Sequence, residues 1–397
     1  MLTFGGRAFV RVALLPSSYY PSVGGVEELT RRLAGELVAR DHSVQVWSSR
    51  RDGDTTPQRD VIDGVSVQRF TFPMPRAAAG PLLRWPVQAA HVLAQLHASV
   101  RDFQPDVLHV QCFSSNGVYA AALSRLTGVP LVVSLQGETV MDDRDIYEHS
   151  LSLRGGLRFG LRQAAQVTAC SRFTLNDVLE RFGGDPRTSQ VIFNGVALEE
   201  GGAGEALELP FSVFALAIGR VVHKKGFDLL LQAFALLTDL PEGSGLVIGG
   251  DGAELTNLRA QAARLGISDR VSFTGTLTRA QVAWAMRQAR CFVMPSRLEP
   301  FGIVVLEAWR AGTAVIASSI GGAPEFVEDG VSGLLVDPYD GERLAEALGS
   351  LLRDPVLAAN LGRAGRRRVE DLTWPRLAQD YLAVYESTRG SHDGRSR

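Results

Sequence analysis

One segment, residues 213–237, reads VFALAIGRVVHKKGFDLLLQAFALL. Its first six residues, Val213–Ile218, form the short apolar run that is typical of a strand buried on both faces of a parallel sheet. A turn with Gly219 and Gly226 follows, and Phe227–Leu237 then repeats apolar residues at helical spacing. The segment therefore predicts a strand, a loop and a helix, the unit from which parallel α/β sheets are built.

Similar apolar runs recur on both sides of this segment and alternate with amphipathic stretches. Strands that alternate with helices imply a parallel sheet with helices on both faces. The two series are separated by residues 197–210, which carry three glycines and four glutamates and have little to pack, as in a linker. The other predicted strands are 10–15, 44–47, 107–110, 131–135 and 167–169 before the linker, and 246–248, 271–273, 291–294, 314–317 and 334–336 after it.

The pattern predicts an α/β protein with two tandem Rossmann-like, doubly wound domains that face a cleft. We expect an N-terminal domain over residues 1–197, a linker over 198–212 and a C-terminal domain over 213–373. Residues 374–397 start with helical apolar spacing, so we expect a last helix that packs back onto the N-terminal domain, followed by a tail. Ligands of such sheets bind at the carboxyl ends of the strands, here toward the cleft.

Composition excludes several classes of protein. The chain has 397 residues and is 45% hydrophobic and 21% charged, as expected for a folded globular protein. Its 41 basic and 43 acidic residues balance to a net charge of -2, which argues against nucleic acid as a partner. The three cysteines are far apart, and the first apolar run is too short for a signal peptide or a membrane span. These features predict a cytoplasmic protein without a disulfide framework.

Two cations follow the strand at 213–218. Arg220 comes directly after Gly219, and Lys225 stands five residues further on. The chain contains only two lysines, Lys224 and Lys225, so the other 39 of its 41 basic residues are arginine. Cations on a strand-to-helix turn can neutralise a diphosphate leaving group. The alternative for this turn is a solvated basic surface.

A second informative segment, residues 296–308, reads SRLEPFGIVVLEA. It follows an apolar run and is predicted to open a helix with Pro300 in the first turn. The free amides of Phe301, Gly302 and Ile303 would then bind phosphate oxygens. On a continuous helical rise, Glu299 and Glu307 would lie ~12 Å apart, which suits a ligand with hydroxyl groups at both ends and a diphosphate between them.

Several motifs, taken together, are similar to the retaining glycosyltransferases of family 4, which have the GT-B fold. In the second half of the chain they include Gly219-Arg220 and Lys225-Gly226, Gly249-Gly250-Asp251-Gly252, the Glu-x7-Glu pair of Glu299 and Glu307, and Gly321-Gly322-Ala323-Pro324-Glu325. In the first half they are Gly24-Gly25-Val26-Glu27 and Asn194-Gly195-Val196. The resemblance covers nearly the whole chain.

The resemblance implies a function for each matching residue. The second domain would bind a nucleotide-diphosphate sugar, with Arg220 and Lys225 on the diphosphate, together with Gly219 and Gly250. Glu307 would bind the ribose, and Glu299 with the backbone of Pro300, Phe301, Gly302 and Ile303 would contact the transferred sugar. Gly24 and Gly25 would close over the phosphates from the first domain, which binds the acceptor. The reaction would keep the anomeric configuration and would need neither a protein nucleophile nor a metal ion.

Two positions depart from the family pattern, and one of them is Ala197, which stands where an aspartate usually follows Asn-Gly-Val. Many family members have a histidine before glycine after the fourth strand of the first domain, in contact with the donor sugar. Here the stretch is Gln136-Gly137-Glu138, and we assign a sugar or acceptor contact to these three residues. A glutamine can hydrogen-bond a hydroxyl group but cannot titrate near neutral pH. The sequence leaves three classes of acceptor: a sugar, a lipid-linked sugar or a small molecule.

Other signals admit plainer interpretations. Asp143-Arg144-Asp145 has the form of a metal-binding D-x-D, but it lies in a charged stretch where a solvated loop is expected. Arg154, Arg158 and Arg162 share one helix face, which would suit anionic lipid headgroups and peripheral membrane contact, or simply solvent. Gly250-Asp251-Gly252 resembles a dinucleotide fingerprint, but Leu255 stands where the third glycine belongs.

Two other functions share much of this pattern. A nucleotide-sugar epimerase of the same fold would convert the donor without an acceptor. A non-catalytic protein would bind a nucleotide sugar but would neither transfer nor hydrolyse it. The combination of two cations with the Glu-x7-Glu pair favours transfer, and an oxidoreductase is the most distant of the alternatives.

Overall fold

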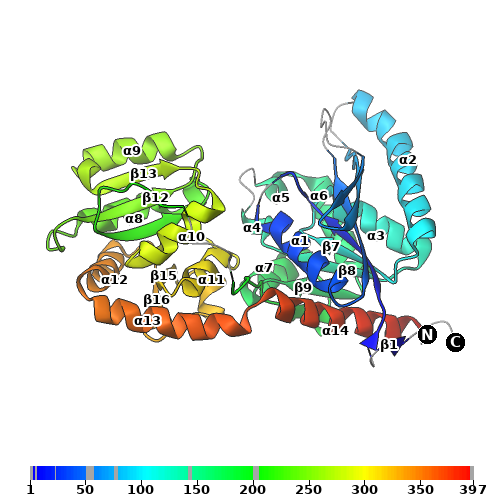
Figure 1. Ribbon diagram of the computed structural model, residues 1–397. Helices are drawn as coiled ribbons and strands as arrows, with labels where there is room; N and C mark the ends of the chain where they lie inside the picture. The colour runs from blue at the N-terminus through cyan, green and yellow to red at the C-terminus, as the bar shows by residue number, and fades with distance from the viewer. Residues whose placement is uncertain are drawn as a thin grey trace. The chain divides into compact units, whose positions relative to one another are not determined.

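The computed structural model describes residues 3–4, 7–22, 24–50, 58–75, 79–141, 145–199 and 205–393. The chain divides into two compact units (Figure 1). Unit 1 comprises Met1–Asn194 together with Trp374–Arg397, and unit 2 comprises Gly195–Thr373. Unit 2 is thus inserted in sequence between two parts of unit 1. Residues 200–204 of the predicted linker region lie outside the described residues.

Unit 1 is built on an eight-stranded sheet. All neighbouring strands are parallel except the last pair at one edge, which is antiparallel. A separate antiparallel pair, β1 (Thr3–Phe4) and β2 (Arg7–Ala8), precedes the sheet. The strand order is β10 (Ser189–Val191), β9 (Gln166–Ala169), β8 (Leu131–Leu135), β7 (Val107–Gln111), β3 (Arg11–Pro16), β4 (Ser43–Ser49), β6 (Val65–Phe70) and β5 (Arg59–Ile62).

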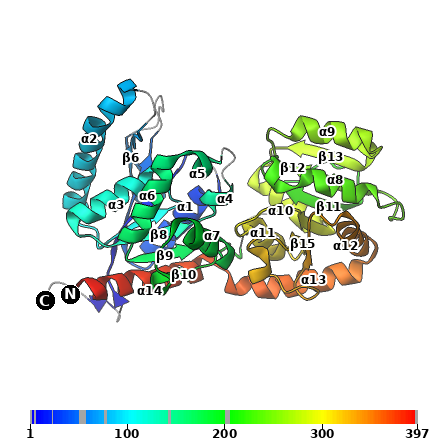
Figure 2. The ribbon, with the colours of Figure 1, turned by 180° about the vertical axis from the view of Figure 1, so that it is seen from behind.

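Helices cover both faces of this sheet. Helices α2, α3, α6 and α7 lie on one face (Figure 2). Their apolar residues form one continuous core with those of the strands. On the opposite face, α1 contacts β3 and β4 and packs against the C-terminal helix α14 (Figure 1). The helices of unit 1 are α1 (Gly25–Val38), α2 (Ala79–Phe103), α3 (Ser115–Thr127), α4 (Glu138–Met141), α5 (Ile146–His149), α6 (Leu151–Gln163), α7 (Arg172–Phe182), η1 (Pro186–Thr188) and α14 (Trp374–Asp393).

Unit 2 is built on a six-stranded, wholly parallel sheet. The strand order is β13 (Val271–Gly275), β12 (Ser244–Gly249), β11 (Val213–Ile218), β14 (Cys291–Met294), β15 (Ala314–Ser318) and β16 (Leu334–Val336). Helices α8, α9 and α12 share an apolar core with one face, and α10 contacts α11. The helices are η2 (His223–Lys225), α8 (Phe227–Ala235), α9 (Leu255–Arg264), η3 (Ser268–Arg270), α10 (Arg279–Gln288), α11 (Ile303–Arg310), η4 (Ala323–Glu325), α12 (Gly341–Arg353), α13 (Pro355–Arg368) and η5 (Val369–Asp371).

Both sheets are doubly wound, as predicted. The order of strands reverses between β3 and β7 in unit 1 and between β11 and β14 in unit 2. At such a switch point the loops after two neighbouring strands leave in opposite directions, which opens a crevice where ligands bind. The predicted α/β class and every predicted strand are confirmed, although β1, β2, β5, β6 and β10 were not predicted. Within the described ranges, no helix combines the length and apolarity that crossing a membrane requires.

Candidate functional site

The switch point of unit 2 brings together the two loops that carry the predicted donor-binding residues. Lys225 lies in η2, after β11, and Glu299 lies in the loop after β14. The Lys225 Nζ atom donates a hydrogen bond to Glu299 Oε2 over 2.5 Å, and Ser296 Oγ lies 3.3 Å from the same oxygen. Glu299 is buried, with 7% of its surface exposed. An ammonium group has three donors, so this ion pair leaves Lys225 able to bind a further anion.

A second ion pair fixes these loops to each other. Arg297 Nη1 and Nη2 each donate to one carboxylate oxygen of Asp228, both over 2.6 Å, and Arg297 Nη1 also donates to the carbonyl of His223. Burial is the largest single influence and would raise the pKa of Asp228, but the hydrogen bond and the positive charge of Arg297, together with a backbone hydrogen bond, hold that pKa below its ordinary value. Two parallel N–H donors also set the relative orientation of the two groups. The turn that carries Lys225 is therefore held against the loop that carries Glu299.

Two glycines allow backbone segments to lie close to the loop after β14, one from the turn after β11 and one from the loop after β15. Gly226 has φ +69°, and a Cβ atom there would lie 2.0 Å from the carbonyl oxygen of Pro295. Gly321 has φ +113°, and a Cβ atom there would lie 2.1 Å from the carbonyl oxygen of Glu299. The same carbonyl accepts a hydrogen bond from the amide of Gly322 over 2.8 Å. Both positions need glycine for its backbone angle and for the space that a side chain would take.

The helix after Glu299 starts later than predicted. Helix α11 begins at Ile303 with Gly302 as its N-cap in the left-handed region, so the prediction that Pro300 lies in its first turn is wrong. Pro300 and Phe301 are buried in the preceding loop, where the Phe301 ring lies 4.6 Å from that of Phe326. The reason is the parallel bridge between Glu299 and Gly321, which keeps this loop extended. The ~12 Å rise estimated from a continuous helix therefore does not apply.

The other predicted residues of unit 2 surround this pair of loops. Gly219 and Arg220 follow β11, and Arg220 is exposed. The Gly219 amide donates to the carbonyl of Gly249, while the amide of Gly250 donates to the carbonyl of Gly275. Glu307 lies within α11 and is half-buried. The structure thus gathers these residues at the carboxyl ends of β11, β12 and β14.

In unit 1, the predicted glycines lie at the corresponding edge of the sheet. Gly24 is the N-cap of α1 and Gly25 is its first residue, and both are exposed. The loop before them is held by Tyr20, whose hydroxyl donates to Glu28 over 2.7 Å. The buried Arg69 donates to the carbonyl of Tyr20 over 2.9 Å. Gly24 and Gly25 are therefore exposed to solvent next to a loop that Glu28 and Arg69 hold through Tyr20.

Glu138 has a structural position that its sequence context did not indicate. Its Oε1 atom accepts a hydrogen bond from the amide of Phe113 over 2.5 Å, and its Oε2 atom accepts one from the amide of Gln136 over 2.7 Å. Burial raises the pKa of Glu138, and the two backbone amides oppose that rise. Its carboxylate ties the loop after β7 to the loop after β8 and so fixes the backbone of Gln136.

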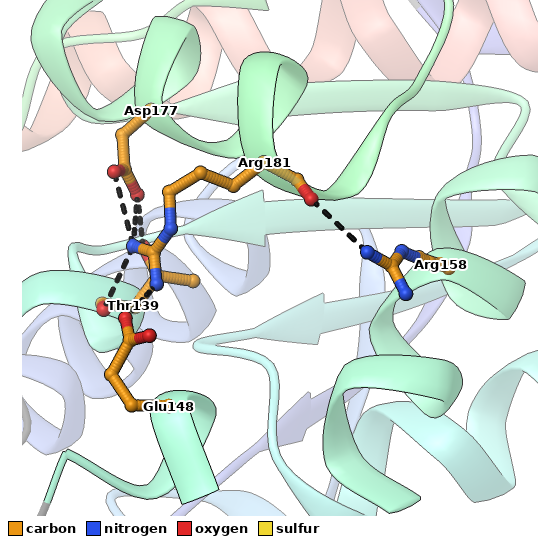
Figure 3. Close-up of polar contacts among 5 residues, drawn as sticks. All are labelled: Thr139, Glu148, Arg158, Asp177 and Arg181. Atoms are coloured by element: carbon orange, nitrogen blue, oxygen red, sulfur yellow. Dashed lines mark hydrogen bonds and ion pairs between the residues drawn. The ribbon is translucent and has the colours of Figure 1, made fainter. Parts of the chain in front are cut away.

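An arginine cluster holds the segment that follows (Figure 3). Arg181, on α7, donates to both carboxylate oxygens of Asp177 over 3.1 and 3.2 Å, to the carbonyl of Thr139 over 3.4 Å, and to Glu148 on α5. Arg158, the middle residue of the predicted basic row, donates to the carbonyl of Arg181 over 3.4 Å. The cluster joins α4, α5, α6 and α7 (Figure 3), and Thr139 directly follows Glu138 in the chain.

A buried polar network in unit 1 was not predicted. His109 Nδ1 lies 2.7 Å from the hydroxyl of Tyr385 on α14, and its Nε2 lies 2.6 Å from Ser134 Oγ and 3.1 Å from Gln111 Nε2. Burial lowers the pKa of His109 to about 3, so its ring is neutral at ordinary pH. The signal in the sequence was a histidine and a glutamine inside the apolar strand VLHVQ.

None of the three cysteines forms a disulfide. Across the part of the chain that the structure describes, no three His, Cys, Asp or Glu side chains are grouped so as to hold a metal ion. Asp143 and Arg144 of the D-x-D sequence lie outside the described residues.

Comparisons with known proteins agree with the sequence resemblance. Residues 23–200 match the model of Glycosyltransferase Family 4, and residues 211–368 match that of Glycosyl transferases group 1. The chain is 30% identical to a D-inositol 3-phosphate glycosyltransferase from Streptomyces scabiei, over 94% of this chain and 88% of that protein.

Solved structures show the same fold. Sucrose-phosphate synthase from Thermosynechococcus elongatus superposes with a TM-score of 0.78 at 22% identity, over 96% of this chain and all of that one. Anabaena HepE in complex with UDP-glucose superposes with a TM-score of 0.72 at 22% identity, over 95% of this chain and all of that one. With two doubly wound units and a relative that matches it almost end to end, the chain belongs to the family 4, group 1 glycosyltransferases and has the GT-B fold.

Proposed function

We propose that this glycosyltransferase moves a hexose from a nucleoside-diphosphate sugar to an acceptor hydroxyl group with retention of the anomeric configuration. The observation that carries the proposal is the pair of Lys225 and Glu299 at the switch point of unit 2, 2.5 Å apart and next to the start of α11. A cation, a carboxylate and the start of a helix at one place suit a ligand that has both phosphate oxygens and hydroxyl groups.

The roles divide between charge and hydroxyl recognition. Arg220, Lys225 and the first amides of α11 would hold the diphosphate, with the loop of Gly219 and Gly250 beside it. Glu307 would accept hydrogen bonds from the ribose, and Glu299 from the transferred sugar. In unit 1, Gly24 and Gly25 would contribute backbone amides, and Gln136 would contact the sugar. HepE, of the same fold, has been solved with UDP-glucose, which makes UDP the first nucleoside diphosphate to test.

In the proposed reaction the departing phosphate accepts the acceptor's proton, and no protein side chain acts as a nucleophile. The anomeric carbon–oxygen bond to the diphosphate breaks while a bond to the acceptor oxygen forms on the same face. The acceptor proton moves to the phosphate oxygen that departs. Arg220 and Lys225 would stabilise the negative charge that develops on the diphosphate, so we propose a metal-independent reaction. The Lys225 bond to Glu299 leaves two N–H donors for this purpose.

The acceptor is proposed only by its class, a hydroxyl group on a sugar, a lipid-linked sugar or a polyol. The Streptomyces relative is named for an inositol phosphate, which supports the polyol. An anionic lipid surface would suit the row of Arg154, Arg158 and Arg162 on α6, and we place the enzyme in the cytoplasm, where such a surface would be the inner face of the membrane.

The test begins with thermal shifts of the full chain in UDP, GDP, ADP, dTDP and NAD. A ligand at one hundred times its dissociation constant adds about 2.7 kcal/mol of stability. A shift with one nucleoside diphosphate supports the donor site. A shift with NAD alone, or with none of the five, contradicts it.

The second step uses UDP-glucose, or the sugar nucleotide of whichever base gives the shift. NMR of the freshly released glucose identifies its anomer. Slow release of α-glucose would support a retaining transferase, and release of β-glucose would contradict retention. An epimerase would convert the nucleotide sugar without an acceptor. A binding protein would leave it unchanged while still giving the thermal shift.

A further inference from the structure

A line of side chains crosses unit 1 from α14 to the last residue of its N-terminal part. Tyr385, on α14, contacts His109, and Gln111 contacts the other side of the His109 ring. Gln136 Nε2 donates to Gln111 Oε1 over 3.4 Å, and Asn194 Nδ2 donates to Gln136 Oε1 over 3.1 Å. We call these five hydrogen-bonded residues the amide relay; Gln136 belongs to it and lies in the loop after β8.

The relay has a single direction of donation. Because the Gln111 amide nitrogen donates to His109 Nε2, His109 Nε2 is the accepting nitrogen. The neutral ring therefore carries its proton on Nδ1, toward Tyr385. Gln111 then accepts from Gln136, and Gln136 accepts from Asn194. One amide can turn over only if its neighbours turn with it, because two donors or two acceptors would otherwise face each other. The orientation of the Gln136 amide is thus set by buried residues on both sides.

Asn194 supplies a second, independent observation. It is 5% exposed, and its Oδ1 atom is buried without a hydrogen-bond partner among the described residues. A buried acceptor that is left unpaired destabilises a fold. Asn194 nevertheless keeps its amide nitrogen aimed at Gln136. A residue whose place in the fold is unfavourable, but which orients a neighbour at the candidate site, is expected to be kept for function.

We propose that Gln136 selects the transferred sugar by its hydroxyl pattern, and that Asn194 and Gln111 are positioning residues that fix the Gln136 amide. The inference rests on the proposed function, because it takes Gln136 as a contact of the donor sugar. Gln136 uses one N–H and one lone pair within the relay and keeps one of each for a ligand. In the fixed orientation it offers a donor and an acceptor at defined places, which discriminates between sugars that differ in one hydroxyl group.

The test compares variants of the full chain. Asn194→Asp keeps the shape of the side chain but can only accept, so the Gln136 amide must turn its nitrogen toward residue 194. Gln111→Leu removes the other partner. Matched controls are Tyr119→Phe and Ser124→Ala, which each remove a buried hydrogen bond of unit 1, to the carbonyls of Pro73 and Val129, outside the relay.

The readout is the ratio of the dissociation constants of UDP and UDP-glucose, or of GDP and GDP-mannose if the wild type prefers guanine. We expect both relay variants to bind the nucleoside diphosphate within about twofold of wild type and to lose about five- to tenfold in affinity for the sugar nucleotide. The controls should leave the ratio unchanged, and thermal unfolding checks that all four variants fold.

The outcomes separate the two proposals. If the wild type binds no nucleoside diphosphate, the proposed function fails, and the role of Gln136 fails with it. If the wild type binds both ligands and the relay variants keep the wild-type ratio, the donor site stands and the positioning role is refuted. A relay variant that does not fold is replaced by Gln136→Leu, which should give the same loss in the ratio, and an unchanged ratio in that variant also refutes the proposal.

Discussion

Replacing Gly226 by alanine isolates the close approach that joins the two loops of the donor site. The matched control is Gly266→Ala. Gly226 and Gly266 have nearly the same backbone angle, φ +69° and +68°. A Cβ atom at Gly226 would lie 2.0 Å from the carbonyl oxygen of Pro295, whereas one at Gly266 would meet nothing within 4 Å. The two variants therefore share the backbone strain and differ in the clash.

The expected magnitudes follow from this difference. A left-handed alanine costs roughly 1–2 kcal/mol in either variant. At position 226 the loops must also separate by about 1 Å, and such overpacking costs about 1–3 kcal/mol more. The separation strains the hydrogen bond from the Arg297 amide to the Lys224 carbonyl, 3.0 Å long, which adds about 1 kcal/mol. Gly226→Ala should thus lose about 2–4 kcal/mol more than Gly266→Ala.

Activity should separate the two variants even more clearly. A shift of about 1 Å between Lys225 and Glu299 should lower turnover of UDP-glucose by roughly 10²-fold. The Gly266→Ala variant should keep turnover within about twofold of wild type. Hydrogen exchange in peptides from β11 and β14 reports the stability of unit 2 by itself, which is needed because a chain of two units need not unfold in one step.

Equal losses of stability and turnover in both variants would refute this account of Gly226. Such a result would mean that the left-handed backbone, and not the contact with Pro295, makes glycine necessary there. It would also remove the reason for treating the Lys225 turn and the Glu299 loop as one fixed unit.

Three further predictions concern charge. Burial lowers the pKa of His109 from 6.5 to about 3, so its contribution to the free energy of unfolding is fully present above pH 6.5 and is lost as the pH falls toward 3. The loss between pH 6.5 and 5 is about 2 kcal/mol. Hydrogen exchange of β7 should show this decrease in stability with falling pH, and the His109→Gln variant should lack it. Arg297→Lys cannot keep both bonds to Asp228 and should destabilise unit 2 by about 1–2 kcal/mol in the same assay, with an unchanged value arguing against the pair. Glu307→Ala should weaken UDP binding about tenfold or more while thermal unfolding stays near wild type, and unchanged binding would remove Glu307 from the site.

The sequence was sufficient to predict the six strands of the unit 2 sheet and five strands of the unit 1 sheet, because strands buried on both faces are continuous apolar runs. β8, β14 and β16 begin and end at the predicted residues. The edge strand β5 was not predicted because Arg59–Ile62 begins with two charged residues, and an edge strand need not be apolar.

The site was predictable in its residues but not in its contacts. Lys225 and Glu299 are 74 residues apart, and only the order of strands makes them neighbours. The preference of proline for the first turn of a helix predicted a start near Pro300, but the bridge between Glu299 and Gly321 moves the start to Ile303. The partner of His109 could not be predicted because it comes from α14, 276 residues away.

The insertion of unit 2 within unit 1 has a consequence for biosynthesis. The chain is made from its N-terminus, so all of Gly195–Thr373 is synthesised before Trp374 is added. Unit 2 therefore has its complete sequence first, while unit 1 still lacks α14, which packs against α1 on one face of its sheet. Until Tyr385 is synthesised, His109 has no partner for its Nδ1 atom. The half of the protein that begins first is the half that finishes last, and truncations near the C-terminus should impair unit 1 while sparing unit 2.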